Sequence, residues 1–381
     1  MSGLESLLKQ YVSDGTLPGA VALVGSSDRV EVAVAGSRDI EGTSPMTRDS
    51  IFRVASITKT AVATVVMMLV DDGRIGLNDP IAQWLPEMAA PMVARTPQSA
   101  LDDVVSAVRP ITVSDLLTSR AGWGWPSDFS YPAVQALFSV QRDGRRLSLY
   151  PATQEEWLSE LAAVPLLYQP GEAWLYDTCS VLQGILISRV TGQSLADVMT
   201  ERLFEPLGMV DTGFHVPAAK RDRMTTFYLY DADGRIEHVD GPDGDWSRPP
   251  TFPLGHGGLV STIDDWYAFA RFLLAEGHVA EKQLLSAEAV RQMTTNHLTP
   301  AQREIGQLFL DGQGWGFGGT VDVEPSQPWH VPGRYGWVGG TGTSAHIVPS
   351  ARSIAVFFTQ RGGGPGTPSW LSDFWTYATH A

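Results

Sequence analysis

A serine and a lysine stand three residues apart at the start of a largely apolar segment. Ser56-Ile57-Thr58-Lys59 precedes residues 60–70, most of which have apolar side chains. Because residues i and i+3 share a helix face, the lysine amine can lie beside the serine hydroxyl. An amine in that position can accept the serine proton, and the N-terminal end of a helix favours negative charge nearby. The segment therefore predicts Ser56 as a nucleophile and Lys59 as part of its general base.

The same four residues have a plain structural alternative, in which Ser56 caps a helix and Lys59 lies on the surface. An isolated Ser-x-x-Lys match is expected by chance in a chain of this length. Residues 60–70 favour the chemical interpretation, because a helix that is apolar on nearly every side is buried. Burial places Ser56 and Lys59 at the edge of the core, where desolvation lowers the pKa of a lysine.

Composition and histidine spacing exclude several other classes of function. The chain has 381 residues and a formal net charge of −15, which disfavours nucleic acid and anionic membrane surfaces as partners. Its eight histidines are scattered and predict no metal site or cofactor, and His256, in a Gly-rich turn, is interpreted as a hydrogen-bonded loop residue. Cys179 is the only cysteine, so no intramolecular disulfide can form. The first residues lack the basic and apolar regions of a signal peptide, so we expect a cytoplasmic location.

Hydrophobic patterns predict a sheet that is built from both ends of the chain and a mostly helical middle. Residues 19–36 form a predicted hairpin with its turn at 26–28, and residues 57–72 form a helix closed by Gly73. A second hairpin is predicted at an Asp-Gly turn within 224–239, and Ser261-Thr262-Ile263-Asp264 resembles a capping box before a helix. Further helices are predicted at 112–119, 153–164 and 180–205, and further strands at 314–323, 334–338, 343–349 and 353–359. An amphipathic segment at 369–379 is expected to pack back on the sheet.

Two other segments complete a pattern with the serine and lysine. One is Trp174-Leu175-Tyr176-Asp177-Thr178, which follows a Pro-Gly-Glu turn, and the other is the Gly-rich stretch at 336–343. Together with Ser56-x-x-Lys59, their order and spacing resemble the serine β-lactamase/penicillin-binding superfamily. The chain is most similar to the class C β-lactamase-like esterases, also called family VIII carboxylesterases. The supporting segments are residues 51–55, 116–122, 204–209 and 255–262.

This resemblance implies an α+β fold of the β-lactamase/transpeptidase type, an antiparallel sheet flanked by helices. Residues 1–80 and 240–381 would form the sheet-and-helix domain, and residues 81–239 a mostly helical inserted domain, with the active site at their interface. Ser56 would be the nucleophile of an acyl-enzyme mechanism, with Lys59 and Tyr176 sharing the work of the base. The main-chain N–H groups of Ser56 and Gly340 would form the oxyanion hole.

Two departures from the family pattern bear on the substrate. Thr178 stands where β-lactamases carry an asparagine, and Trp337-Val338-Gly339 replaces Lys-Thr-Gly, which removes the cation that would pair with a β-lactam carboxylate. Both changes favour neutral, apolar acyl substrates, and Trp337, Gly339, Thr178, Asp177 and Trp123 are the predicted substrate-binding residues. Asp177 has two interpretations: it orients Lys59, or it caps the helix that follows.

The resemblance implies a serine hydrolase that cleaves short- to medium-chain neutral carboxylic esters, with a small-molecule ester as its partner. Three alternatives remain open from sequence. They are an amide hydrolase of the same fold (a β-lactamase, a D-amino-acid peptidase or a small-amide hydrolase), an acyltransferase, and a non-catalytic binding protein. The natural substrate and the oligomeric state are beyond the sequence.

Overall fold

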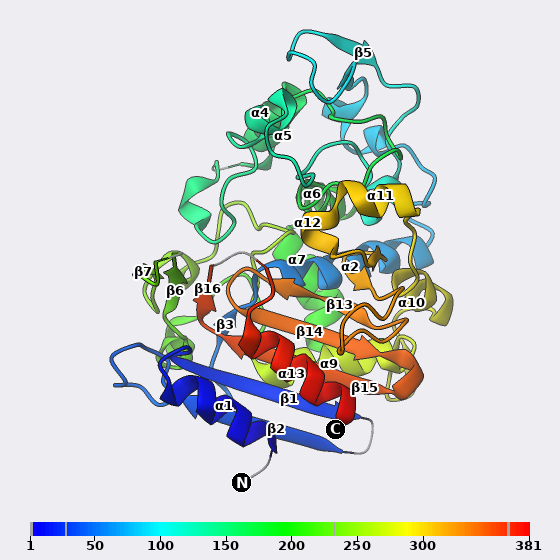
Figure 1. Ribbon diagram of the computed structural model, residues 1–381. Helices are drawn as coiled ribbons and strands as arrows, with labels where there is room; N and C mark the ends of the chain where they lie inside the picture. Colours follow the sequence, from blue (N-terminus) through cyan, green and yellow to red (C-terminus); the bar gives the residue numbers. More distant parts are fainter. Residues whose placement is uncertain (1–2, 27–28, 152, 232, 364–365) are drawn as a thin grey trace.

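The computed structural model describes residues 3–26, 29–151, 153–231, 233–363 and 366–381. Its centre is a seven-stranded antiparallel sheet in the order β11-β12-β13-β14-β15-β1-β2, so strands from the two ends of the chain lie side by side (Figure 1). The predicted turn at 26–28 falls largely outside the described residues. The strands of the sheet are β1 (Gly19–Ser26), β2 (Val30–Gly36), β11 (Gly314–Trp315), β12 (Thr320–Val321), β13 (Tyr335–Gly339), β14 (Thr343–Val348) and β15 (Ser353–Thr359).

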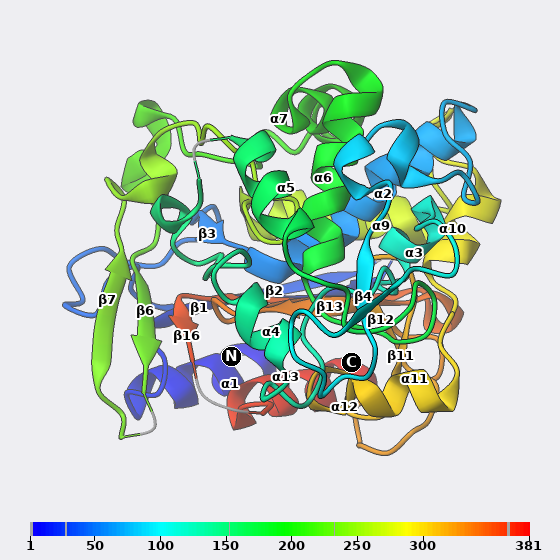
Figure 2. The same cartoon turned by 90° about the horizontal axis from the view of Figure 1, so that it is seen from above.

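Helices cover both faces of this sheet, as Figure 2 shows. Because side chains alternate along a strand, Val21 and Leu23 of β1 join the large core, whereas Ala20 and Ala22 join a smaller cluster on the other face. The smaller cluster is closed by α1 (Gly3–Ser13) and α13 (Ser369–His380), and α9 (Ile263–Leu274) packs against the opposite face. The α+β architecture predicted from the sequence is confirmed.

The helix α2 (Thr58–Asp71) runs through the large core, and every residue from Thr58 to Leu69 is buried. It ends where predicted, because Gly73 adopts φ +67° and donates its main-chain N–H to the carbonyl oxygen of Val70. A short 3₁₀ turn, Ala55–Ile57, immediately precedes α2 and contains Ser56. The most apolar helix of the chain therefore fixes the position of the predicted nucleophile.

The middle of the chain, residues 81–239, has more residues in helices than in strands, and much of it lies above the sheet in Figure 1. The predicted helix at 180–205 is divided: α6 ends at Gly192 in the left-handed conformation, and α7 is followed by a π-helical turn over Thr200–Phe204. Side chains of α2, α6 and the sheet share one continuous core, so the division into two domains stays a prediction. The helices of this part are α3 (Val113–Leu117), α4 (Pro132–Leu137), α5 (Gln154–Ala162), α6 (Thr178–Thr191), α7 (Leu195–Met199) and α8 (Glu205–Leu207).

The second predicted hairpin is present as β6 (Phe227–Tyr230) and β7 (Ile236–Asp240), which pair with each other beside β16 (Arg361–Gly362). The cap of α9 is one residue later than predicted: the hydroxyl of Thr262, not of Ser261, accepts the main-chain N–H of Asp265 at 3.3 Å. Within the described residues, no helix is long and apolar enough to cross a bilayer. The remaining elements are β3 (Phe52–Arg53), β4 (Met92–Ala94), β5 (Val104–Ser106), β8 (Val260–Ser261), β9 (His278–Val279), β10 (Lys282–Gln283), α10 (Ala287–Met293), α11 (Pro300–Ile305) and α12 (Gln307–Leu310).

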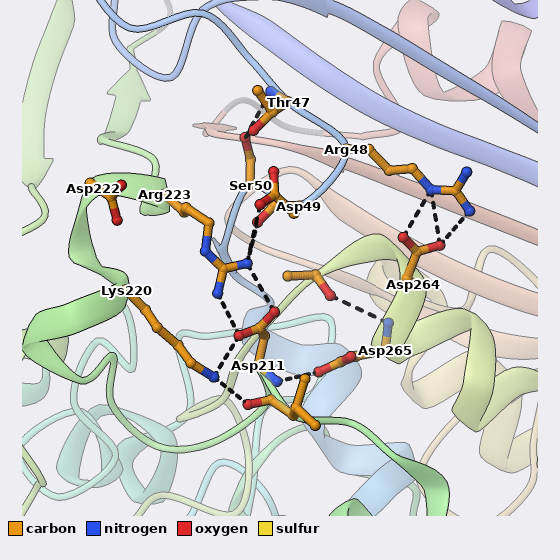
Figure 3. A network of polar contacts seen from close by, with 12 residues as sticks. Thr47, Arg48, Asp49, Ser50, Asp211, Lys220, Asp222, Arg223, Asp264 and Asp265 are labelled. Carbon is orange, nitrogen blue, oxygen red and sulfur yellow. Dashed lines mark hydrogen bonds and ion pairs between the residues drawn. The ribbon is translucent and has the colours of Figure 1, made fainter.

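A polar network fastens the segment that leads into β3 and Ser56 (Figure 3). Asp211 is its centre, with Lys220 Nζ at 2.7 Å and Arg223 Nη2 at 2.5 Å from one carboxylate oxygen. Arg223 also donates to the carbonyl oxygen of Asp49 at 3.0 Å, while Arg48 pairs with Asp264 of α9 at 2.7 Å. The loop before the nucleophile is therefore tied to two distant parts of the chain.

Candidate active site

Ser56 lies at the N-terminal end of α2, half-buried, with the side chain of Lys59 directly beside it. Lys59 Nζ is 3.0 Å from Ser56 Oγ, and Lys59 is only 1% exposed. Ala55, just before the serine, has φ +47°, which is a strained conformation for a residue other than glycine. The structure thus brings together the pair that the spacing predicts.

The surroundings of Lys59 keep it charged, contrary to the expectation from burial alone. Burial lowers its pKa, but the carboxylate of Asp177 at 2.7 Å and the neighbouring Tyr176 outweigh burial, so the pKa of Lys59 is raised. The ammonium also donates to the main-chain carbonyl oxygen of His256 at 2.7 Å. The prediction of a lysine with a lowered pKa is therefore wrong, because it considered burial and left out the charge of Asp177.

Tyr176 comes from the middle of the chain and lies beside Ser56 and Lys59. Its main chain exchanges two 3.0 Å hydrogen bonds with that of Trp125, which fixes its backbone at the edge of the site. Lys59 Nζ lies 4.7 Å from the centre of its ring, within the range of a cation–π interaction. The indole N–H of Trp337 donates to Tyr176 Oη at 2.8 Å. Trp337 is only 5% exposed, so the structure makes it a hydrogen-bond partner of the tyrosine rather than the broad apolar surface predicted for it.

Asp177 adopts φ +86° and ψ −61°, a costly backbone conformation for an aspartate. It precedes α6 but makes no side-chain capping bond, so of its two interpretations the structure supports the orientation of Lys59. Its second carboxylate oxygen accepts a 2.7 Å hydrogen bond from Gln141 Nε2. Burial raises the pKa of Asp177, but the charge of Lys59 and the hydrogen bonds from Lys59 and Gln141 hold that pKa below its usual range.

Sequence reasoning missed three groups that surround the ion pair of Lys59 and Asp177. They are the side chains of Gln141 and Tyr150 and the main-chain carbonyl group of His256. Tyr150 Oη lies 3.2 Å from His256 Nε2, and that nitrogen is 3.9 Å from the Asp177 carboxylate. Burial lowers the pKa of His256 to about 4, so its ring is neutral at pH 7. This agrees with the interpretation of His256 as a loop residue. No motif marks Gln141 or Tyr150, because each reaches the site through long-range packing.

The turn after β13 is fastened to the main chain just before Ser56. Thr343 Oγ1 donates to the Val54 carbonyl oxygen at 2.8 Å, and Thr341 Oγ1 donates to the Arg53 carbonyl oxygen at 2.6 Å. A side chain at Gly339 would place its Cβ 2.4 Å from that Val54 oxygen, so only glycine fits. Gly340 is exposed and follows directly, next to the segment that holds Ser56.

Two predicted substrate-binding residues lie in the core instead. Thr178 is 0% exposed, and its hydroxyl oxygen has no hydrogen-bond partner among the described residues. Trp123 is 3% exposed, and its indole N–H donates to the Val164 carbonyl oxygen at 2.8 Å. Neither side chain offers surface to a ligand, and the prediction that they contact substrate is corrected. Thr178 is turned inward because it starts α6, whose first turns are buried on all sides.

The site combines a Ser–Lys pair, a tyrosine from a distant segment and a Gly-rich turn beside the serine. Comparison with known proteins identifies the family in which this combination belongs. The beta-lactamase family profile matches residues 4–371. The chain belongs to the beta-lactamase family. The resemblance noted in the sequence is therefore confirmed over nearly the whole chain.

Relatives in this family include proteins described as hydrolases and acyltransferases. Protein Rv1367c of Mycobacterium tuberculosis (strain ATCC 25618 / H37Rv) is 35% identical over 370 residues, which cover 94% of this chain and 90% of that protein. Esterase EstB of Burkholderia gladioli is 30% identical over 326 residues, which cover 83% of this chain and 78% of that protein. The structure of EstCE1, described as a hydrolase with promiscuous acyltransferase activity, superposes with a TM-score of 0.79 at 24% identity and covers 98% of this chain and 97% of that one. The last comparison confirms the fold.

Proposed function

We propose that this chain is a serine esterase that hydrolyses short- to medium-chain neutral carboxylic esters through an acyl-enzyme on Ser56. The observation that carries the proposal is the 3.0 Å contact between Lys59 Nζ and Ser56 Oγ beside the ring of Tyr176. The 30% identity to a protein described as an esterase supports the choice of ester over amide. In this proposal Ser56, Lys59 and Gly340 come from the sheet-and-helix part, and Tyr176 and Asp177 from the inserted part at 81–239.

Tyr176, rather than Lys59, takes the proton of Ser56 in this mechanism. Lys59 is held as a cation by Asp177 at 2.7 Å, and an ammonium group has no lone pair to accept a proton. Its charge and the N–H of Trp337, 2.8 Å from Tyr176 Oη, both stabilise a phenolate. The phenolate oxygen accepts the proton as Ser56 Oγ attacks the carbonyl carbon of the ester.

The remaining steps release the alcohol and then the carboxylic acid. The main-chain N–H groups of Ser56 and Gly340 hold the negative oxygen of the tetrahedral intermediate. When the intermediate collapses, the bond from the acyl carbon to the alcohol oxygen breaks, and that oxygen takes the proton from Tyr176. Tyr176 then takes a proton from water, the water oxygen attacks the acyl carbon, and Ser56 Oγ leaves with the proton. The products are the carboxylic acid and the alcohol.

The preference for neutral substrates rests on Trp337. It stands where the family pattern has a lysine, and its indole is engaged with Tyr176. Without that cation, a substrate carboxylate gains no ion pair from this strand. The aromatic rings of Phe309 and Trp337 lie against Tyr176, so a neutral acyl or alcohol group can be bound there by contact and burial.

The test is p-nitrophenyl butyrate hydrolysis by the wild type, Ser56→Ala and Tyr176→Phe, with Ser159→Ala, an exposed serine on α5, as the matched control. We expect the first two variants to lose several orders of magnitude in kcat and the control to match the wild type. Full activity in Ser56→Ala would remove the proposal. Turnover of cephalosporins or D-amino-acid amides without ester turnover would move the function to amide hydrolysis, and product analysis with added alcohols separates acyl transfer.

A further inference from the structure

Four aromatic side chains form a contiguous group beside the candidate site: Trp125, Phe129, Phe138 and Phe309. We call this group the aromatic shelf. The ring centres of Trp125 and Phe138 are 4.4 Å apart, and Phe129 lies 6.1 Å from each of them. Phe129 also meets Phe309 edge-on at 6.3 Å. These are the separations at which aromatic pairs attract each other, so the four rings act as one surface.

The aromatic shelf is open to solvent. Phe138 is 49% exposed, and it is the only aromatic residue among the large hydrophobic side chains that are strongly exposed in the described part of the chain. The other three members are half-buried, and Leu308, next to Phe309, is 59% exposed. Exposed apolar side chains that are gathered in one place mark a binding surface more often than scattered ones do.

The aromatic shelf is joined directly to Tyr176. The ring of Phe309 is stacked on that of Tyr176, with 4.6 Å between centres and 28° between planes. Trp125 is bonded to Tyr176 through the main chain, as described above. A cavity of about 250 Å³ is lined by Phe309, Trp337 and Gly340 among other residues, and Phe309 is the shelf member that borders it. One end of the aromatic shelf therefore lies against Tyr176, the residue proposed to transfer the proton.

The position of Tyr176 decides which part of an ester meets the shelf, given the proposed function on which this inference rests. The alcohol oxygen takes its proton from Tyr176 Oη, so it must lie within hydrogen-bond reach of that atom. The acyl carbon, in contrast, is bonded to Ser56 Oγ, and its oxygen is held by the N–H of Gly340. The group attached to the alcohol oxygen consequently lies beside Tyr176, where Phe309 is stacked.

We propose that the aromatic shelf binds the alcohol moiety of the substrate and that esters of aromatic alcohols are the preferred substrate class. An aryl group next to the ester oxygen can stack on Phe309 and extend toward Phe129 and Phe138. Because the alcohol leaves before water attacks, the shelf accelerates formation of the acyl-enzyme and has no part in its hydrolysis. This separates it from a pocket for the acyl chain, which would act on both steps.

The test compares benzyl butyrate with methyl butyrate, which yield the same butyryl-enzyme. We expect the wild type to prefer the benzyl ester in kcat/KM, and Phe309→Ala to lower the benzyl-to-methyl ratio about three- to tenfold, the value of one aromatic contact. Phe138→Ala, at an exposed position that does not threaten folding, lowers the same ratio by a smaller factor. Leu101→Ala, also 49% exposed but outside the shelf, leaves the ratio unchanged. The rate of hydrolysis of the butyryl-enzyme, measured in single turnovers, is the same in the wild type, Phe138→Ala and Leu101→Ala, none of which alters a residue stacked on Tyr176.

Two results would overturn the inference while leaving the proposed function intact. One is an unchanged benzyl-to-methyl ratio in both shelf variants. The other is an altered preference between ethyl acetate and ethyl octanoate with no change in the benzyl-to-methyl ratio, which would assign the shelf to the acyl chain. A wild type that hydrolyses none of these esters refutes the proposed function itself, and the assignment of the shelf to an ester falls with it.

Discussion

Replacing Asp177 by asparagine removes the charge that faces Lys59 and keeps the size of the side chain. At 2.7 Å, Coulomb's law with an effective dielectric constant of about 20 gives an attraction of about 6 kcal/mol. Asparagine recovers part of this through hydrogen bonds, and breaking a buried pair by removal of one partner costs about 3–5 kcal/mol of stability. We therefore expect Asp177→Asn to lower the free energy of unfolding by about 3 kcal/mol or more.

The pH profile of kcat/KM reports what this charge does in catalysis. Asp177 raises the pKa of Lys59 against the effect of burial, so its loss lowers that pKa, and Lys59 releases its proton at a lower pH. If Tyr176 needs Lys59 as a cation, the alkaline limb of the profile moves to lower pH. If the variant loses about 3 kcal/mol of transition-state stabilisation, kcat/KM falls about 100-fold near neutral pH.

The opposite outcome would refute this reasoning. An Asp177→Asn variant that is faster than the wild type near neutral pH would show that neutral Lys59 is the base and that Asp177 restrains it. Asp322→Asn is the matched control, because Asp322 forms another buried ion pair, with Arg334 at 2.8 Å, and borders the same 250 Å³ cavity without contacting Lys59 in the described part of the chain. We expect the control to lose stability and to keep the pH profile of the wild type.

Three further predictions follow from single contacts. Trp337→Phe keeps a ring but removes the 2.8 Å hydrogen bond to Tyr176 Oη, so kcat should fall about tenfold or more with little change in KM; an unchanged kcat would contradict the role of the indole. Gly339→Ala places a methyl group 2.4 Å from the Val54 carbonyl oxygen and should lower the stability by about 1–3 kcal/mol, whereas Gly340→Ala, whose nearest neighbour is Arg145 Cδ at 3.8 Å, should keep the melting temperature. The pKa of His256 falls from 6.5 to about 4 on folding, so between these pH values the unfolded chain binds one proton more than the folded chain. The free energy of unfolding therefore decreases by about 3 kcal/mol as the pH drops from about 6.5 to about 4. In urea titrations at several pH values, His256→Asn should lack this part of the pH dependence, and an unchanged dependence would contradict it.

The sequence was sufficient where the signal is local and strong. The strand over 353–359 and the helix that begins after Ser56 are long apolar segments that admit few alternatives, and both are present as predicted. The pair Ser56 and Lys59 is set by helix geometry, since three residues along a helix return the chain to the same face. Where two neighbouring residues were equally good caps, the pattern predicted Ser261 and the structure uses Thr262.

The environment of the site could not be predicted, because it depends on side chains that meet across long separations. Gln141 and Phe309 carry no motif, yet Gln141 touches Asp177 and Phe309 touches Tyr176. His256 lies in a segment that supports the resemblance, but nothing in that segment shows that its main-chain carbonyl group binds Lys59. The rise in the pKa of Lys59 depends on a carboxylate 118 residues away, at a backbone conformation that no propensity favours. The likeness to the family also placed Thr178 at the substrate, where the structure has a buried helix start.

The most direct test of the central claim is the mass of the protein after rapid acid quenching during turnover of p-nitrophenyl butyrate. We predict one butyryl group on the peptide that contains Ser56 in the wild type and none in Ser56→Ala. A butyryl group on another residue, or undiminished hydrolysis with Ser56 never acylated, would contradict the mechanism.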